Sequence, residues 1–281
     1  MPRSTLRATG IVTLIAAALL GSAYALGRSL VPDQPRPRTG VAASVNSPHY
    51  ADQPPATPDS SASVGPSPTP DGGQHPSDTG DGPFGSLVST GSPRVALTFD
   101  DGPDPQYTPQ VLALLREYGV KATFCVVGEN AERNPDLIQE IVAAGHTLCN
   151  HSWNHDLTLG KRSPDVIRAD LLRTNEAIRA AVPDARIAYF RQPGGAWTRP
   201  VVSVCEELGM APLHWTVDPS DWTTPGAGKI TAAVMTETGP GAIVLMHDAG
   251  GNRTGTVQAL HSLLPELMDR FQLEALPIGT T

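Results

Sequence analysis

The chain has 281 residues, of which 40% are hydrophobic and 17% charged, and its formal net charge at pH 7 is −8. This length provides for one or two domains with a sizeable core. Residues 92–281 hold 15 basic and 22 acidic side chains, with no basic tract. Because nucleic-acid binders depend on basic contacts to phosphate, we expect no nucleic-acid partner.

The chain begins with a segment typical of exported proteins. Arg3 and Arg7 precede an apolar run from about residue 8 to residue 26, which contains the small-residue pattern Ala23-Tyr24-Ala25. A short basic region followed by such a run and such a site predicts a signal peptide over residues 1–27. The run is also nearly long enough to remain as a membrane anchor, so the sequence leaves both forms open. In either case we expect the folded domain to be extracellular or at the cell surface.

A proline-rich stretch follows. Twelve of the 28 prolines lie between Pro32 and Pro83, among serine, threonine, aspartate, glycine and alanine. Such a composition cannot bury enough apolar surface to offset its chain entropy. We therefore predict a disordered Pro/Ser/Gly-rich linker over residues 28–91, which tethers a folded domain over residues 92–281.

Strands and helices alternate along the folded domain. Short apolar runs predict strands, and apolar residues at helical spacing predict helices. The predicted strands are 94–99, 120–127, 146–149, 189–191, 211–217 and 242–247, and the predicted helices are 108–118, 135–144, 164–181, 200–208 and 256–271. This alternation indicates an α/β protein with a parallel sheet, either open or closed into a barrel. In both cases chemistry gathers at the carboxyl ends of the strands.

The chain has three cysteines, Cys125, Cys149 and Cys205, which is too few for a disulfide framework. Cys125 and Cys149 are the pair best placed to oxidise, since both fall near predicted strand ends. Neighbouring parallel strands accommodate a disulfide poorly, so we expect buried free thiols.

Reactive side chains recur at the predicted strand ends. They are Asp100, Asp101, His151, His155, Arg191, Asp218, Asp221, His247 and Asp248. His151 and His155 are four residues apart, so we expect them on one face of a helical turn, where they could chelate one ion together with a carboxylate. A pair of surface histidines would have the same spacing. Asp100 and Asp101 could also serve only to form a turn and cap a helix, since Asp101-Gly102-Pro103 is a sequence typical of turns. A free carboxylate beside a metal-bound water is, however, suited to act as a general base. To Asp248 we assign no role.

Five motifs resemble, in order, those of the polysaccharide deacetylases, the NodB-homology enzymes also called carbohydrate esterase family 4. They are Thr98-Phe-Asp-Asp-Gly102, His151-Ser-Trp-Asn-His155, Arg191-Gln-Pro-Gly-Gly195, Asp218-Pro-Ser-Asp-Trp222 and Leu245-Met-His247. The resemblance covers residues 93 to about 275 and none of the linker. It implies a distorted (β/α) barrel of the NodB-homology type with a groove across its top.

The resemblance also implies a role for each matching residue. Asp100 is the catalytic base, Asp101, His151 and His155 hold the metal, Arg191 holds the base, Asp221 supports the general acid His247, and Trp222 and Leu245 line the acetyl pocket. The expected ion is Zn²⁺, with Co²⁺, Ni²⁺ or Mn²⁺ as alternatives. The family often has a tyrosine where this chain has Gly194, whose backbone N–H helps to stabilise the oxyanion. Core packing is the simplest role for all four tryptophans, at 153, 197, 215 and 222, but we favour the core for Trp215 and the groove for Trp222.

The function implied is a secreted or surface-tethered, monomeric, metal-dependent hydrolase. It would remove N-acetyl groups from acetylated polysaccharides built on N-acetylglucosamine, either peptidoglycan or chitin oligomers, with a metal-activated water, an aspartate base and a histidine acid. An O-deacetylase such as an acetylxylan esterase shares the motifs, so the sequence leaves it open. A non-catalytic glycan-binding module is the alternative from another class. A serine hydrolase is disfavoured because the chain has no G-x-S-x-G motif.

Overall fold

The computed structural model describes residues 81–278. The predicted export signal and most of the predicted linker lie outside these residues. Within residues 81–278, no helix is both long enough and apolar enough to cross a bilayer.

The described region is an α/β fold built on one parallel sheet, as the sequence predicts. Its six strands follow the order β5-β4-β3-β2-β1-β6. Their bounds are β1 Ala96–Asp100, β2 Thr123–Val126, β3 Thr147–Asn150, β4 Ile187–Phe190, β5 Ala211–Pro212 and β6 Ile243–His247. Every neighbouring pair is parallel, so all six carboxyl ends meet at one edge of the sheet.

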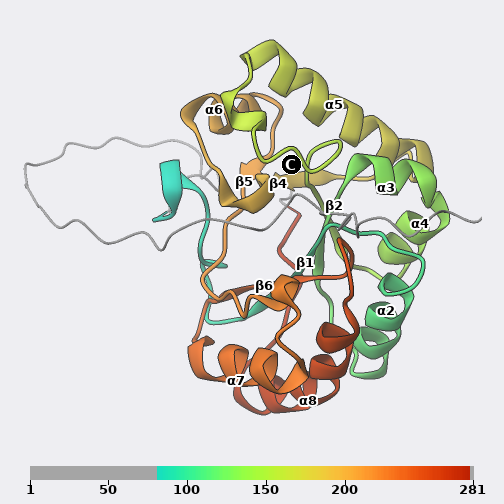
Figure 1. The fold of residues 1–281 in the computed structure, drawn as a ribbon, viewed down its shortest axis with the longest axis vertical. Coiled ribbons are helices and arrows are strands. Elements are labelled where there is room, and N and C mark those ends of the chain that lie inside the picture. Colours follow the sequence, from blue (N-terminus) through green and yellow to red (C-terminus); the bar gives the residue numbers. More distant parts are fainter. Residues whose placement is uncertain (1–80, 279–281) are drawn as a thin grey trace, which may run out of the picture. The chain divides into compact units, whose positions relative to one another are not determined.

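Helices cover the outer face of the curled sheet (Figure 1). They are α2 Thr108–Glu117, α3 Gly128–Arg133, α4 Pro135–Ala143, α5 Pro164–Ala181, α6 Arg199–Glu207, α7 Ala227–Glu237 and α8 Thr254–Arg270. The sequence analysis did not predict α3 or α7. α3 has only six residues, too few to show an apolar periodicity, and α7 buries only Ile230 and Val234, so its apolar pattern is weak.

Residues before the predicted domain boundary help to close the sheet. The backbone of Leu87 pairs with Leu213 after β5, and Ser89 pairs with Ala242 before β6. A further bridge, between Val217 and Val244 of β6, also links the two edges of the sheet. Residues of the predicted linker, just before the predicted domain start at 92, therefore also pair with the sheet. The predicted strand 211–217 is too long, because β5 comprises only Ala211–Pro212. Leu87 pairs along the edge of this segment: its N–H donates to the Pro212 carbonyl, and its carbonyl accepts from the His214 N–H.

The sheet has an apolar layer on each side. Outward side chains such as Leu97, Phe99 and Phe124 form one core with the helices. Inward side chains, including Ala96 and Tyr189, form a smaller core inside the barrel together with Leu276.

The last described residues pass across the end of the barrel where β2 and β3 begin. The Leu276 N–H donates to the Thr123 hydroxyl at 3.0 Å, and the Thr147 hydroxyl donates to the Leu276 carbonyl at 2.7 Å. The Tyr189 hydroxyl donates to the Pro277 carbonyl at 2.7 Å. The C-terminal segment therefore covers the floor of the barrel, opposite the carboxyl ends of the strands.

Cys125 and Cys149 form a disulfide in the inner core. The expectation of free thiols is wrong for this pair and correct for Cys205, which is free and buried. The register of β2 and β3 explains the bridge, because it places the two cysteines directly opposite each other with a Cα–Cα distance of 4.1 Å.

Candidate active site

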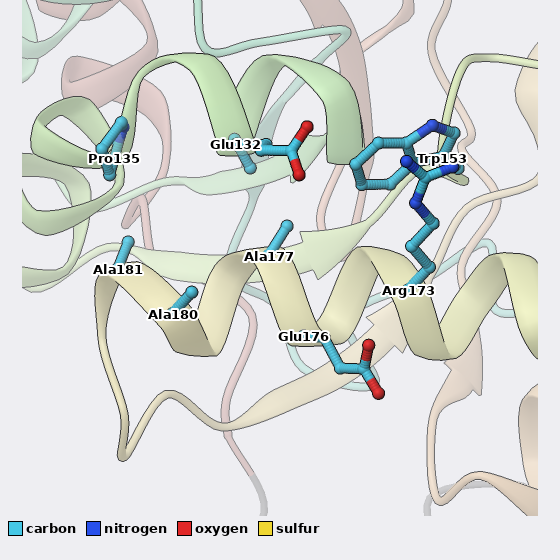
Figure 2. A pocket seen from close by; sticks show the side chains of 9 residues that line it. Glu132, Pro135, Trp153, Arg173, Glu176, Ala177, Ala180 and Ala181 are labelled. Carbon is cyan, nitrogen blue, oxygen red and sulfur yellow. The ribbon is translucent and has the colours of Figure 1, made fainter.

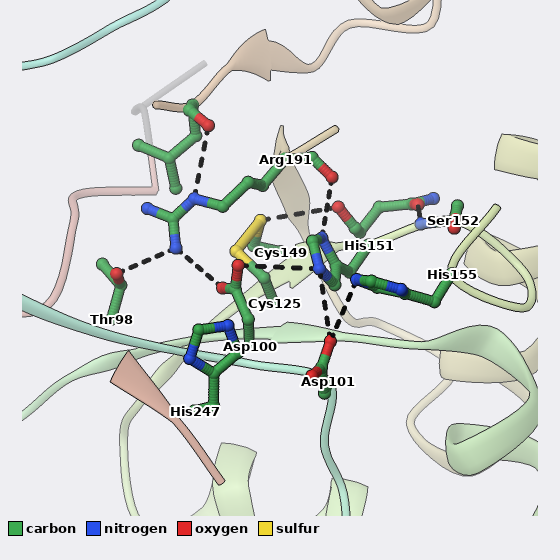
Figure 3. Close-up of polar contacts among 12 residues, drawn as sticks. Thr98, Asp100, Asp101, Cys125, Cys149, His151, Ser152, His155, Arg191 and His247 are labelled. Carbon is green, nitrogen blue, oxygen red and sulfur yellow. Dashed lines mark hydrogen bonds and ion pairs between the residues drawn. A yellow bond between two sulfur atoms is a disulfide. The ribbon is translucent and has the colours of Figure 1, made fainter. Parts of the chain in front are cut away.

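Four buried polar residues from four strand ends converge at the upper edge of the barrel (Figure 3). Asp100 ends β1 and His247 ends β6, and the two residues are paired in register. His151 directly follows β3, and Arg191 directly follows β4. The parallel order of the strands thus brings together residues that lie up to 147 positions apart in the chain.

Three side chains are arranged as a ligand set beside this cluster. The Oδ1 atom of Asp101 lies 3.3 Å from Nε2 of His155 and 3.5 Å from Nε2 of His151. This oxygen is buried and accepts no hydrogen bond. Four ligands at about 2.1 Å around a tetrahedral ion lie about 3.4 Å from one another, so these separations fit a divalent cation. The residues present therefore suit the metal that the motifs imply.

The electrostatics of the trio also suit a cation. Burial acts to raise the pKa of Asp101, but the imidazoles of His151, His155 and His247 outweigh burial and hold that pKa well below its usual range. Burial lowers the pKa of His155 to about 4, so this imidazole is neutral at pH 7. The Nδ1 atom of His151 lies 2.8 Å from the Arg191 carbonyl. A proton on Nδ1 would donate to that carbonyl and leave the Nε2 lone pair directed at Asp101.

The backbone of the ligand residues is unusual. Asp101 has a φ of 75°, Ser152 of 65° and His155 of 58°. Residues with side chains avoid this left-handed region, at a cost of about 1–3 kcal/mol each, and functional sites are where such outliers cluster. The segment from His151 to His155 is an irregular loop. The expectation that the two histidines share a face of a helical turn is therefore wrong, and the loop brings them together instead.

The start of α3 holds the ligand loops in place. The backbone N–H groups of Gly128 and Glu129 donate to the carbonyls of Ser152 and Trp153, at 3.0 and 2.9 Å. The side-chain amide of Asn130 donates to the Asp101 carbonyl at 2.8 Å. A Cβ atom at Gly128 would lie 2.5 Å from the Trp153 ring, so only glycine permits this contact. None of these α3 residues was singled out from the sequence.

Trp153 anchors the ligand loop from the other side. Its backbone N–H donates to the Asp170 carboxylate at 2.9 Å, and the Arg173 guanidinium lies 3.5 Å from the centroid of its indole ring. Figure 2 shows this stacking beside a pocket of about 490 Å³ between α5 and the α3–α4 segment, to which Glu132 and Glu176 also contribute. Trp153 is 7% exposed, as expected for a core residue.

Arg191 holds the carboxylate of Asp100. Its Nη1 donates to Oδ1 of Asp100 at 2.7 Å and to the Thr98 hydroxyl at 2.9 Å. Its remaining nitrogens donate to the carbonyls of Leu213 and His214. Because Arg191 is fully buried, these contacts fix the Asp100 side chain, whose Oδ2 lies 3.6 Å from Nε2 of His151.

His247 and Asp221 form the opposite side of the site. Nδ1 of His247 lies 2.6 Å from Oδ1 of Asp221, and the His247 backbone N–H donates to Oδ2 at 3.0 Å. The Thr256 hydroxyl donates to the same Oδ2 at 2.6 Å. Burial acts to lower the pKa of His247, but Asp221, with Asp101 and Asp100, outweighs burial and raises it to about 9. At pH 7 this imidazole is therefore a protonated acid.

The three residues expected to contact substrate lie next to this cluster in the chain. Leu245 is two residues before His247 on β6, so its buried side chain shares a face of the strand with His247. Trp222 directly follows Asp221 and is half-buried. Gly194 has a φ of 60°, and a Cβ atom there would lie 2.8 Å from Cδ2 of Leu157. A tyrosine at position 194 would be strained, because Leu157 packs against the backbone there.

Asp218 and Asp248 lie beside the same cluster. The Asp218 carboxylate accepts from the Ser220 N–H at 2.7 Å, which shapes the turn that leads to Asp221. Asp248 is fully buried, and the Thr108 hydroxyl donates to it at 2.5 Å. A Cβ atom at Gly102 would lie 2.5 Å from either carboxyl oxygen of Asp248. Asp248, which the sequence analysis left without a role, therefore packs tightly under the turn after Asp101.

Comparisons with known proteins point to one family. The polysaccharide deacetylase family model matches residues 88–213. The chain is 42% identical over 201 residues to a chitooligosaccharide deacetylase of Sinorhizobium fredii, covering 67% of this chain and 92% of that one. It is 41% identical over 175 residues to a peptidoglycan-N-acetylglucosamine deacetylase of Bacillus cereus, covering 62% of this chain and 81% of that one.

A solved structure with the same fold is a carbohydrate esterase family 4 pseudoenzyme of Bacillus anthracis. Its TM-score is 0.63 at 30% identity, over 68% of this chain and 67% of that one. The expectation of a distorted barrel of this type is confirmed. Because a pseudoenzyme has the same fold, the fold alone does not indicate catalytic activity. An argument for activity must rest on the side chains described above.

Proposed function

This chain belongs to the polysaccharide deacetylases, which are hydrolases of carbon–nitrogen bonds other than peptide bonds. Because it belongs to this family, we propose that it removes N-acetyl groups from N-acetylglucosamine units. Chitooligosaccharides and peptidoglycan are the proposed substrates, because the relatives are named for them. The reaction uses a cation held by Asp101, His151 and His155, with Asp100 as base and His247 as acid.

One observation carries the proposal: a buried carboxylate oxygen without a hydrogen bond lies 3.3 and 3.5 Å from two imidazole nitrogens, next to a second carboxylate held by Arg191. An unpartnered buried carboxylate oxygen is costly unless a cation completes it. When bound, a divalent cation supplies Lewis-acid polarisation of the acetyl carbonyl and lowers the pKa of water. Zn²⁺ suits two imidazoles and one carboxylate, and Co²⁺, Ni²⁺ or Mn²⁺ would accept the same ligands.

The protein's own groups move the protons. Asp100, oriented by Arg191, takes a proton from the attacking water while the water oxygen bonds to the acetyl carbon. His247, charged and oriented by Asp221, donates a proton to the nitrogen as the C–N bond breaks. The products are acetate and a free amine. An amine is a poor leaving group unless it is protonated, so the acid is as necessary as the base.

The neighbouring residues would recognise the acetyl group. The Gly194 N–H would donate to the oxygen that gains charge in the transition state. Leu245 and Trp222 would enclose the methyl group, the first from β6 and the second from the short helix Asp221–Thr223. Leu157 lies beside Gly194, where other members of the family often have a tyrosine. The sugar would therefore have less side-chain surface to contact there than a tyrosine ring provides.

We place this activity outside the cytoplasmic membrane, in a monomer that is secreted or tethered at the surface. The basic and apolar pattern of residues 1–27 supports export, and the proline-rich residues that follow would give the domain reach.

Acetate release tests the proposal directly. The purified chain would be stripped of metal, reloaded with Zn²⁺ or Co²⁺, and offered chitin oligomers, peptidoglycan and acetylxylan. We expect acetate from the first two substrates only when an ion is present. Release from acetylxylan alone would indicate an O-deacetylase, and metal binding without turnover of any substrate would indicate a glycan-binding pseudoenzyme.

A further inference from the structure

Two arginines are the largest fully buried side chains in the described region, Arg191 and Arg253. Arg191 forms an ion pair with Asp100 at 2.7 Å. Arg253, at the N-cap of α8, forms no ion pair among residues 81–278, although it is only 2% exposed. A buried guanidinium is costly unless its donors are satisfied, so its partners indicate what it stabilises.

The partners of Arg253 are three main-chain carbonyls. Its Nε donates to Ala249 at 2.5 Å, its Nη2 to Gly250 at 2.9 Å and its Nη1 to Asp221 at 3.3 Å. Two of these carbonyls belong to the loop that follows β6, and the third belongs to the residue that bonds His247. The side chain thus connects the loop after the proposed acid to the backbone of its carboxylate partner.

Asp221 itself is fully engaged. Its two oxygens accept from Nδ1 and the backbone N–H of His247 and from the Thr256 hydroxyl. The Asp221 carbonyl accepts from the Thr224 N–H at 2.9 Å, within a short helix flanked by Ser220 and Thr224 in the left-handed conformation. Arg253 is the second donor to this carbonyl and connects the short helix to the loop after β6, and its positive charge also favours the ionised Asp221 carboxylate.

We propose that Arg253 is a positioning residue for proton donation, which acts on the Asp221–His247 pair as Arg191 acts on Asp100. The inference rests on the proposed role of His247 as general acid. Loss of the guanidinium would disconnect the short helix of Asp221 from the loop after His247, so the imidazolium would no longer hold one orientation toward the departing nitrogen.

A comparison of leaving groups separates this role from a merely structural one. An amide nitrogen must be protonated to leave, whereas 4-nitrophenolate leaves readily without a proton. We therefore measure Arg253→Met and Arg253→Lys on an N-acetylated chitooligosaccharide and on 4-nitrophenyl acetate. Arg270→Met is the matched control, because Arg270 lies on the same helix and also donates to main-chain carbonyls but is exposed.

We expect Arg253→Met to lower kcat on the amide by about 10- to 100-fold at unchanged KM, as the loss of an orienting partner does elsewhere. The loss on the aryl ester should be below about threefold. Arg253→Lys keeps the charge but reaches fewer carbonyls, so it should show a smaller loss with the same selectivity. This variant also tests the inference if Arg253→Met does not fold. Equal losses on both substrates, in either variant, would overturn it.

A His247→Ala background distinguishes failure of this inference from failure of the proposed function. If Arg253 acts through His247, the loss caused by Arg253→Met should disappear there, because effects of residues that act together are not additive. If His247→Ala itself reduces both substrates equally, the proposed general acid is wrong. If His247→Ala is selective and the Arg253 variants are not, only the role of Arg253 is wrong.

Discussion

The three proposed metal ligands and the proposed proton-donating pair lie at the same end of the barrel but are held by different means. Asp101, His151 and His155 lie on irregular loops, two of them with left-handed backbone, and one buried oxygen of Asp101 has no hydrogen bond. Asp221, by contrast, accepts three hydrogen bonds and lies next to a buried arginine. The first side is incomplete without a cation, whereas the second is complete in the protein alone. Loss of the ion should therefore disturb the three ligand residues and leave the Asp221–His247 hydrogen bonds in place.

The largest effect is expected from His151→Ala on the ligand side. Removing one of three protein ligands should reduce bound metal from about one ion per chain to near zero, and turnover should fall by about 10⁴-fold or more. Metal analysis by plasma mass spectrometry and acetate release measure the two quantities. The control is His261→Ala, an exposed histidine on α8. A His151→Ala protein that keeps its ion would contradict the ligand assignment.

Asp100→Asn should separate metal binding from chemistry. The asparagine retains the shape of the side chain but cannot take a proton, so we expect turnover to fall by about 10³- to 10⁴-fold while the ion stays bound. Leaving Arg191 without its carboxylate also lowers the free energy of unfolding, so thermal unfolding must confirm that the variant is folded at the assay temperature. Near-normal acetate release would show that Asp100 is not the base.

A pH profile examines the acid side. His247 donates only when protonated, and the Asp221 carboxylate raises its pKa, so activity on an amide should persist at neutral pH and decline at alkaline pH as the imidazole loses its proton. Once the pH exceeds that pKa, the decline approaches about tenfold per pH unit. Asp221→Asn removes the carboxylate that raises this pKa and should move the decline to lower pH. Asp269→Asn, an exposed carboxylate on α8, should leave the profile in place.

The smallest effect on turnover is expected from the disulfide. A bridge between residues 24 positions apart contributes about 3.5 kcal/mol to the free energy of unfolding through loop-closure entropy. The Cys125→Ala/Cys149→Ala double variant should therefore unfold at lower denaturant concentration and keep its ion and most of its turnover. Cys205→Ala is the control for loss of a buried thiol alone. A large loss of activity at full folding would show that the bridge shapes the site.

The sequence was informative wherever function coincides with a strand end. Asp100, Arg191 and His247 could be located because parallel strands bring their carboxyl ends together whatever the helices do. The left-handed loop between His151 and His155 could not be foreseen, since the pattern is equally compatible with a helical turn. The disulfide depends on the register of β2 against β3, which no local pattern specifies.

The sequence analysis also missed the residues that hold the proposed site residues in place. Gly128 and Asn130 begin a helix too short to produce a clear periodicity, yet they hold both ligand loops. Arg253 follows Gly-Gly-Asn, where an arginine is typical of an exposed turn. Only the packing of α8 against the loop after β6 shows that it is buried. Contacts of this kind depend on tertiary structure, and composition does not reveal them.

The position of the C-terminal segment has a consequence for handling the protein. Leu276 and Pro277 lie between solvent and the interior that contains the Cys125–Cys149 bridge, so these two residues close that end of the barrel. A truncation before Leu276 would open that end of the barrel, and small reductants would then reach sulfur atoms that are now fully buried.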